Sequence, residues 1–337
     1  MSDLAVSGGT ANRSGGTGKL EGQLEQHRVE LTGYCYRMLG SAFEAEDAVQ
    51  DTLVRAWRSV DRFEGRSALR SWLYRIATNV CFDMLNGRRR RALPMDLAPS
   101  KSPDAPVGSP RPENTWIQPI PDGRVLPAAD DPADVAVSRE SVRLAFVAAL
   151  QYLPRRQRAV LILREVLSWR AGEVAELLGT TVASVNSALQ RARATLAASD
   201  TATTDPVQPA DDEQRELLAR YVDAFERFDI ESLVALLHED ATHSMPPFEI
   251  WLRGRADIRK WWLGPGSGCR GSRLVPTVAN GLPAFGQYRS NGPEGGYYPF
   301  SLQVLEVSEG RIVGLKNFLE TTGTLFPLFG LPAQPEG

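Results

Sequence analysis

Arginine and small polar side chains recur on one face of a helix that the sequence predicts over residues 182–196. The groups at or on this face that could reach base edges and phosphates are Thr181, Ser184, Asn186, Ser187, Gln190, Arg191 and Arg193. Further arginines precede it, at Arg155, Arg156, Arg158 and Arg164. A guanidinium stays ionised and can bond two phosphate oxygens at once, so this pattern suggests DNA recognition. The alternative is an ordinary helical hairpin with a hydrated outer face; the density of arginine favours DNA.

A helix-turn-helix over residues 170–193 is the element that would position these groups. Ser168 can cap its first helix, and Gly179 can supply the positive φ that ends that helix. Thr180 or Thr181 can cap the second helix. Apolar residues of the second helix step by three and four and predict one buried stripe: Val182, Val185, Leu189, Ala192 and Leu196.

Charge is distributed unevenly along a chain whose net charge is only −3. Residues 27–91 carry twelve arginines against eight acids, and residues 139–196 carry nine against four. Residues 201–337 carry twelve basic and eighteen acidic groups. Two arginine-rich blocks inside an acidic chain fit phosphate binding, although solvated helix faces are the common origin of such runs. We therefore expect the acidic C-terminal block to lie against the basic DNA-binding faces.

The spacing of apolar residues predicts how the rest of the N-terminal part is divided into domains and linkers. Apolar residues at helical spacing predict three helices over 27–91, after a disordered arm over 1–26. Residues 92–137 are rich in Pro, Asp, Ser and Gly and are interpreted as a linker. The apolar patch at 116–122 within this linker is predicted to dock on a neighbouring surface. A second helical domain is expected over 138–198.

The C-terminal part, from residue 211 onward, combines helical periodicity with short runs that are typical of strands. Two amphipathic helices are predicted over 213–238 and a third over 255–264. Short β-branched runs predict antiparallel strands at 273–280, 284–290, 297–307 and 311–320. Helices followed by strands indicate an α+β domain over 211–323, with an apolar tail at 324–337 that should pack on another surface.

Residues suited to catalysis are few. His238, Asp240 and His243 could do acid–base chemistry, and Trp251, Trp261 and Trp262 could line a pocket. No spacing brings together a nucleophile, a base and an orienting group, so we predict no catalytic residue, metal or cofactor and interpret the chain as not an enzyme.

Three scattered cysteines fit neither a disulfide framework nor a metal site. We find no long apolar run or signal peptide, so the predicted location is the cytoplasm, with no membrane partner.

Two of these segments together resemble a known family. EAEDAVQDTLVRAWRSVDRF and GRSALRSWLYRIATNVCFDMLNGRRRR resemble region 2, and LPRRQRAVLILREV with VNSALQRAR resembles region 4, of extracytoplasmic-function (group IV, sigma-70 family) sigma factors. The resemblance implies a factor that binds core RNA polymerase and directs promoter recognition, melting and initiation. It implies the β′ clamp and the β flap of polymerase as partners, with promoter DNA. The clamp-binding residues that it implies are Glu46, Asp47, Gln50 and Asp51.

The same resemblance places the contacts to the melted minus-ten element. They are Arg62, Arg66, Arg70, Arg75, Asn79, Arg88 and Arg89. Extruding a base costs a few kcal/mol, so cationic support for the exposed strand is required. Trp72 is interpreted as core and Tyr74, two residues on, as facing another side. The second helix of the helix-turn-helix, with Asn186 and Ala188 where relatives commonly have basic residues, would read the minus-thirty-five element.

Residues 211–323 resemble the SnoaL-like branch of the cone-shaped NTF2-like fold, a fold that hosts enzymes, binding modules and scaffolds. The expected protein is therefore multidomain: two all-α domains, the second with a helix-turn-helix, followed by an α+β cone. The resemblance implies that the cone regulates the factor in cis, with an anti-sigma factor or a small ligand as its candidate partner. Two alternatives remain open: a stand-alone helix-turn-helix regulator with a ligand-sensing domain, and a SnoaL-like enzyme fused to a DNA-binding arm.

Overall fold

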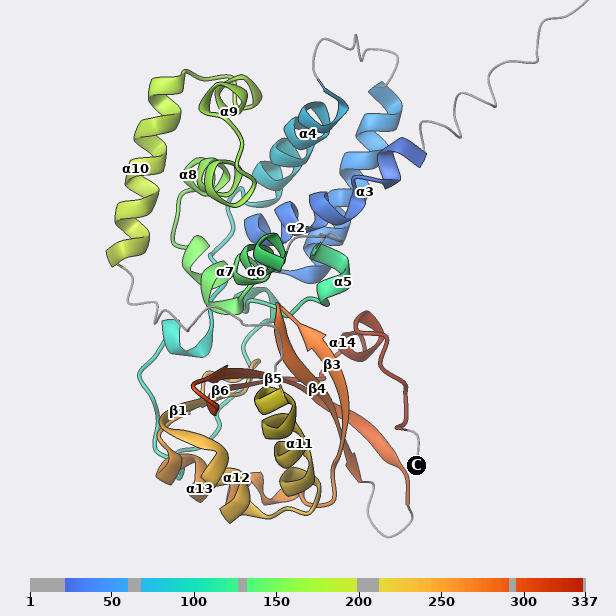
Figure 1. Cartoon of the computed structure of the whole chain (residues 1–337), viewed down its shortest axis with the longest axis vertical. Helices are drawn as coiled ribbons and strands as arrows, with labels where there is room; N and C mark the ends of the chain where they lie inside the picture. Colours follow the sequence, from blue (N-terminus) through green and yellow to red (C-terminus); the bar gives the residue numbers. More distant parts are fainter. Residues whose placement is uncertain (1–21, 60–67, 127–131, 199–211, 291–294, 336–337) are drawn as a thin grey trace, which may run out of the picture.

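A computed structural model describes residues 22–59, 68–126, 132–198, 212–290 and 295–335 (Figure 1). The first helical unit contains α2 (Arg28–Leu39), α3 (Ala42–Ser59) and α4 (Leu69–Met84). Gly40, with φ 71°, ends α2 in the left-handed conformation that glycine adopts readily. The next helix can therefore begin only two residues later.

The second helical unit carries the predicted helix-turn-helix. Its elements are α6 (Pro132–Glu140), α7 (Leu144–Leu150), α8 (Arg155–Leu161), η4 (Ile162–Val166), α9 (Ala171–Leu177) and α10 (Val182–Ala198). Gly179 has φ 59°, and Thr181 Oγ1 accepts a hydrogen bond from the Ser184 amide at 3.1 Å, as predicted. The prediction that Ser168 caps α9 is wrong, because Ser168 itself turns the chain with φ 56°. The helix begins after Arg170, whose amide donates to the Glu173 carboxylate at 2.7 Å.

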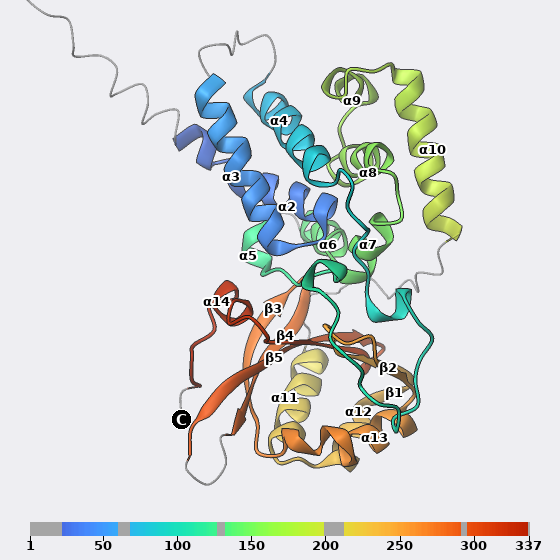
Figure 2. The same cartoon turned by 180° about the vertical axis from the view of Figure 1, so that it is seen from behind.

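The linker is packed over its described length. It contains η2 (Pro94–Asp96), η3 (Glu113–Thr115) and α5 (Asp122–Val125), and Figure 2 shows it running down beside β1, β2 and α13 before it returns to the helices. The Lys101 amide donates to the Trp251 carbonyl at 2.9 Å, and the Trp251 indole donates to the Ala98 carbonyl at 2.8 Å. Ile117 and Ile120 are fully buried, so the prediction that the patch at 116–122 docks on a neighbouring surface is confirmed.

The C-terminal unit is a sheet covered by helices. The helices are α11 (Asp212–Glu226), α12 (Ile230–Leu236) and α13 (Arg255–Leu263), with the short turn η5 (Pro265–Cys269). The sheet has the order β2-β1-β6-β5-β4-β3. Its strands are β1 (Leu237–Ser244), β2 (Trp251–Arg253), β3 (Arg273–Ala279), β4 (Leu282–Ser290), β5 (Tyr297–Ser308) and β6 (Arg311–Leu319). The four predicted strands correspond to β3, β4, β5 and β6, which pair antiparallel as predicted, whereas the unpredicted β1 pairs with β6 in parallel.

The C-terminal tail packs on its own sheet. After β6 the chain forms α14 (Leu325–Leu328). The Phe326 ring lies edge-on to Tyr288 of β4, with centroids 5.0 Å apart, and the Tyr288 hydroxyl donates to the Pro332 carbonyl at 2.7 Å. The tail therefore covers the face of β4 that carries Gly286 and Tyr288, opposite to the face whose Phe285 contacts Tyr221 of α11.

Two clusters of buried apolar side chains form the core. One fills the inside of the sheet between β1, β6 and the helices α11 to α13. The other is continuous through both helical units, the linker and part of the sheet, where it includes Leu282, Leu302 and Val304. None of the helices that the structure describes is long and apolar enough to cross a bilayer.

Candidate polymerase and nucleic-acid interface

The residues predicted to bind the polymerase clamp lie on the outward face of α3. Ala45, Ala48 and Val49 face the other way and are fully buried against the neighbouring helices. The four outward residues, which we call the acidic face, are Glu46, Asp47, Gln50 and Asp51. Asp51 pairs with Arg55 at 2.8 Å, one turn further along the helix. An acidic and amide surface of this kind can pair with basic groups on a partner.

A linker residue already contacts this acidic face. Arg124 of α5 donates to Glu46 Oε1 at 2.6 Å, and Val125 beside it is buried against α2. Arg28 and Thr32 of α2 complete a small cleft there with Asp47 and Gln50. Nothing in the local sequence indicates this contact, because Arg124 lies 78 residues from Glu46.

The predicted minus-ten residues on α4 face the second helical unit. Arg70 donates to Glu30 at 2.8 Å, and its guanidinium lies 5.4 Å from the centroid of Trp169. Arg75 lies 3.6 Å from Glu176 of α9. Asn79 is exposed, whereas Arg62 and Arg66 lie outside the described residues.

The assignment of aromatic residues on α4 was partly wrong. Tyr74 is fully buried, and Trp72 is only partly buried. The ring of Tyr74 lies 5.2 Å from that of Tyr34 and 5.0 Å from that of Trp169. Burial raises the pKa of the Tyr74 hydroxyl, which stays protonated. Tyr74 therefore joins α4 to Trp169, just before the helix-turn-helix, alongside the contacts of Arg70 and Arg75.

The predicted base-reading side chains of α10 are exposed together. Among the described residues, the side chains of Asn186, Ser187, Gln190 and Arg191 have no partner. Arg193 donates to Glu165 at 2.5 Å, and Ser184 is tied to Thr181 at the start of the helix. One expectation fails: Val182, predicted on the buried stripe, is 46% exposed because it stands at the very first turn of α10. Ala188 is buried.

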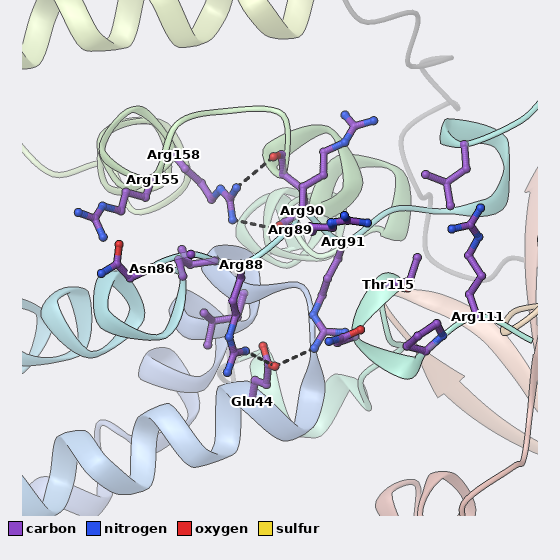
Figure 3. A pocket seen from close by; sticks show the side chains of 17 residues that line it. Glu44, Asn86, Arg88, Arg89, Arg90, Arg91, Arg111, Thr115, Arg155 and Arg158 are labelled. Carbon is purple, nitrogen blue, oxygen red and sulfur yellow. Dashed lines mark hydrogen bonds and ion pairs between the residues drawn. The ribbon is translucent and has the colours of Figure 1, made fainter.

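The arginine run after α4, Arg88–Arg91, contains both buried and solvent-exposed side chains. Arg91 is buried, donates to the Trp116 carbonyl at 2.8 Å and pairs with Glu44. Arg88 converges on the same carboxylate, while Arg89 is exposed (Figure 3). The run therefore anchors the linker and leaves Arg88 and Arg89 beside a cavity.

The C-terminal domain meets the helices through the turn between β3 and β4. Asn280 is fully buried at φ 56°, and its side chain accepts from the Ile120 amide at 3.0 Å. It donates to the Tyr36 hydroxyl and to the Val142 carbonyl, both at 2.7 Å. Among the described residues, no ion pair joins this domain to α4 or α10. The prediction that the acidic block lies on the basic DNA-binding faces is therefore wrong; the contact is apolar and hydrogen-bonded.

The three candidate acid–base residues of the C-terminal domain do not come together. His243 is buried inside the cone, where Asn317 Nδ2 lies 2.9 Å from its Nε2. Burial lowers the pKa of His243 to about 4. Asp240 points outward to Arg253 at 3.7 Å, and His238 accepts from the Asp240 amide at 3.2 Å. Neighbouring strand positions face opposite sides, which explains the separation.

A cavity of about 180 Å³ adjoins His243. Its walls are mainly apolar and include Phe225, Phe228, Met245, Trp261 and Trp262. Gln287 and Gln303 bring amide groups to it, and within the described residues His243 Nδ1 and Asn317 Oδ1 have no hydrogen-bond partner. Trp251, predicted to line a pocket, instead bonds the linker.

Comparison with known proteins agrees with this arrangement. Sigma-70 region 2 matches residues 24–91, Sigma-70 region 4 matches 143–196, and the SnoaL-like domain matches 218–315. The ECF RNA polymerase sigma factor SigG of Mycobacterium tuberculosis is 44% identical, over 98% of this chain and 89% of that protein. SigJ of the same organism is 26% identical over 94% of this chain and 96% of its own length.

The crystal structure of Mycobacterium tuberculosis SigJ has the same fold. It superposes with a TM-score of 0.58 at 21% identity and covers 94% of this chain and 99% of the other. The three family models match this chain in the order region 2, region 4 and SnoaL-like domain. The chain belongs to the ECF RNA polymerase sigma factors and directs the initiation of transcription.

Proposed function

We propose that the acidic face of α3 binds the β′ clamp of core RNA polymerase, and that region 4 binds the β flap. The observation that carries the proposal is the exposure of Asp47 and Gln50, which among the described residues have no intramolecular partner. The chain then works in the cytoplasm, where polymerase works. We propose domain limits of 27–91 for region 2, 138–198 for region 4 and 211–323 for the SnoaL-like domain.

The test is binding to core polymerase. The triple variant Asp47→Ala, Gln50→Ala and Asp51→Ala should lose most of its binding and its promoter-specific initiation. The control is Asp83→Ala, which removes an exposed carboxylate of α4 outside the acidic face. Retention of full binding by the folded triple variant would exclude this surface.

We further propose that the promoter is contacted by two groups of residues. Arg70, Arg75 and Asn79 of α4, with Arg88 and Arg89 and with Arg62 and Arg66 in the part not described, support the melted minus-ten strand. The minus-thirty-five element is read by Thr181, Ser184, Asn186, Ser187, Gln190, Arg191 and Arg193. Arg191→Ala should weaken initiation on a duplex promoter, and the matched control is Arg156→Ala on α8.

Region 2 and region 4 contact each other through Tyr74 and Trp169 in this arrangement. The minus-ten residues and the minus-thirty-five residues therefore cannot reach two widely separated promoter elements at the same time. We propose that the cone regulates initiation in cis by holding this closed arrangement through Asn280. Asn280→Ala should then raise initiation at a limiting concentration of polymerase. Unchanged initiation by the folded variant would exclude the cone as the regulator.

Sigma factors as a family are not enzymes, and we propose that the cone of this chain is not catalytic either. A histidine with a pKa of about 4 is a weak base, and among the described residues no carboxylate orients His243. The unsatisfied polar atoms and apolar walls favour a small, largely apolar ligand with one polar group. An anti-sigma factor is the other candidate partner of the cone. Binding of small cyclic ketones, followed by Trp fluorescence in wild type and His243→Phe, tests the ligand.

A further inference from the structure

Three segments far apart in the sequence enclose one cavity of about 1190 Å³, which we call the arginine cavity (Figure 3). The end of region 2 contributes Arg88–Arg91, the linker contributes Arg111, and region 4 contributes Arg155 and Arg158. Glu44 is the one carboxylate among the lining residues, so the walls hold an excess of six formal positive charges.

Only part of this charge is neutralised within the chain. Arg88 and Arg91 share Glu44, and Arg111 pairs with Glu249 of the C-terminal domain. Arg155 donates to the Phe82 carbonyl at 2.9 Å, a neutral acceptor. Among the described residues Arg89 has no charged or hydrogen-bonded partner. Like charges gathered in a partly enclosed space repel each other strongly, so an anion there would stabilise the protein.

The floor of the cavity is rigid. Arg158 is 4% exposed and donates to the carbonyls of Gln151 and Leu153 at 3.1 and 3.2 Å. Burial without a carboxylate lowers the pKa of Arg158 to about 10, which is the direction that a bound anion would reverse. Arg91 is 8% exposed and fixed by the Trp116 carbonyl. The Nη groups of these two side chains are already bonded within the chain, so they supply fixed positive charge, and the exposed Arg89 and Arg90 are the groups that can bond phosphate oxygens.

We propose that the arginine cavity binds a compact polyphosphate, a small molecule with two or three linked phosphates. Linked phosphates bring several negative charges into one small volume, which matches the charge excess. A nucleic-acid strand carries one charge per phosphate at intervals of about 3.4 Å, and a duplex is far wider than this enclosure. The volume of about 1190 Å³ is slightly above the range of about 300–1,000 Å³ that is usual for small-molecule sites, so a small ligand fits with room for water.

Occupancy of the cavity has a consequence that rests on the proposed function. The ligand contacts region 2, the linker and region 4 at once, so it favours the closed arrangement over any state in which these segments separate. Arg88 and Arg89 are also the proposed promoter contacts. Polyphosphate and promoter therefore compete for the protein, and each weakens the binding of the other.

The test is titration calorimetry of the full chain with inorganic tripolyphosphate at constant ionic strength. Wild type should bind one equivalent. The double variant Arg89→Gln and Arg155→Gln should bind at least tenfold more weakly, because both side chains line the cavity and are exposed. Arg156→Gln, one residue further along α8 and outside the cavity, should bind within twofold of wild type.

Three results would overturn the proposal. They are the absence of saturable binding, an equal loss in Arg156→Gln, and tighter binding of a short single-stranded oligonucleotide, which would assign the cavity to nucleic acid. The proposed function is tested separately, by initiation with core polymerase without tripolyphosphate. Arg155→Gln should initiate as wild type does there, and added tripolyphosphate should inhibit wild type more than this variant.

Discussion

Replacing Asn280 by alanine should destabilise the whole chain. The substitution removes the hydrogen bonds to the Ile120 amide, the Tyr36 hydroxyl and the Val142 carbonyl, all in a fully buried site. Each such bond contributes about 1 kcal/mol net, and an amide left buried without a partner costs about 1–3 kcal/mol. Alanine at positive φ adds about 1 kcal/mol of strain. The unpaired Ile120 amide accounts for about 1–3 kcal/mol, the other two bonds for about 2 kcal/mol and the strain for about 1 kcal/mol, so we expect a loss of about 4–6 kcal/mol in the free energy of unfolding.

The measurement is urea unfolding of the full chain, followed by tryptophan fluorescence. Asn280→Gly separates the two contributions, because glycine loses the same hydrogen bonds without the strain at φ 56°. It should be about 1 kcal/mol more stable than Asn280→Ala. Asn114→Ala, at an exposed linker position, is the control and should change stability by less than about 0.5 kcal/mol. A loss below about 1 kcal/mol in Asn280→Ala would refute the reasoning, since the three bonds would then be replaceable by water.

Three further predictions concern other contacts. Arg124→Ala frees Glu46, so core polymerase should bind a few fold more tightly in a surface-binding assay; the gain is limited to about 1 kcal/mol because the pair is exposed. The pKa of His243 is lowered from 6.5 to about 4 in the folded protein, so the unfolded chain binds this proton at a higher pH than the folded one. The free energy of unfolding should therefore fall by up to about 3 kcal/mol as the pH drops from about 6.5 to 4. His243→Gln should flatten that part of the pH profile, as measured by urea unfolding. Trp169→Ala removes the buried ring that packs on Tyr74, and should lower the free energy of unfolding by about 3–5 kcal/mol. It should also increase the distance between labels on α4 and α10 in energy-transfer measurements.

Local patterns in the sequence predicted much of the fold. The glycines at 40 and 179 stop their helices as expected, because positive φ is a local requirement. The stripe of Val185, Leu189 and Ala192 is buried, because helical spacing determines which side chains share a face. Strands β1 and β2 were missed, since β1 carries charged residues at its exposed positions and lacks the β-branched run that marks the others.

Contacts between distant segments could not be predicted. Nothing local in Asn280 indicates that it meets Tyr36, 244 residues away. The same holds for the covering of Glu46 by Arg124 and for the arginine cavity, whose walls come from three segments. Sequence resemblance predicts surfaces such as the acidic face. Which of its residues already have a partner within the chain, as Glu46 and Asp51 do, depends on contacts that only the folded structure contains.

The buried cluster that runs through both helical units, the linker and the sheet has a consequence for engineering the protein. In a chimera that exchanges only the cone between relatives, the new cone would have to pack against Ile117 and Ile120 and supply the hydrogen bonds that Asn280 makes. The linker and the β3–β4 turn would have to be transplanted with the cone. Relatives built this way are expected to diversify by concerted substitution across that boundary rather than by independent exchange of modules.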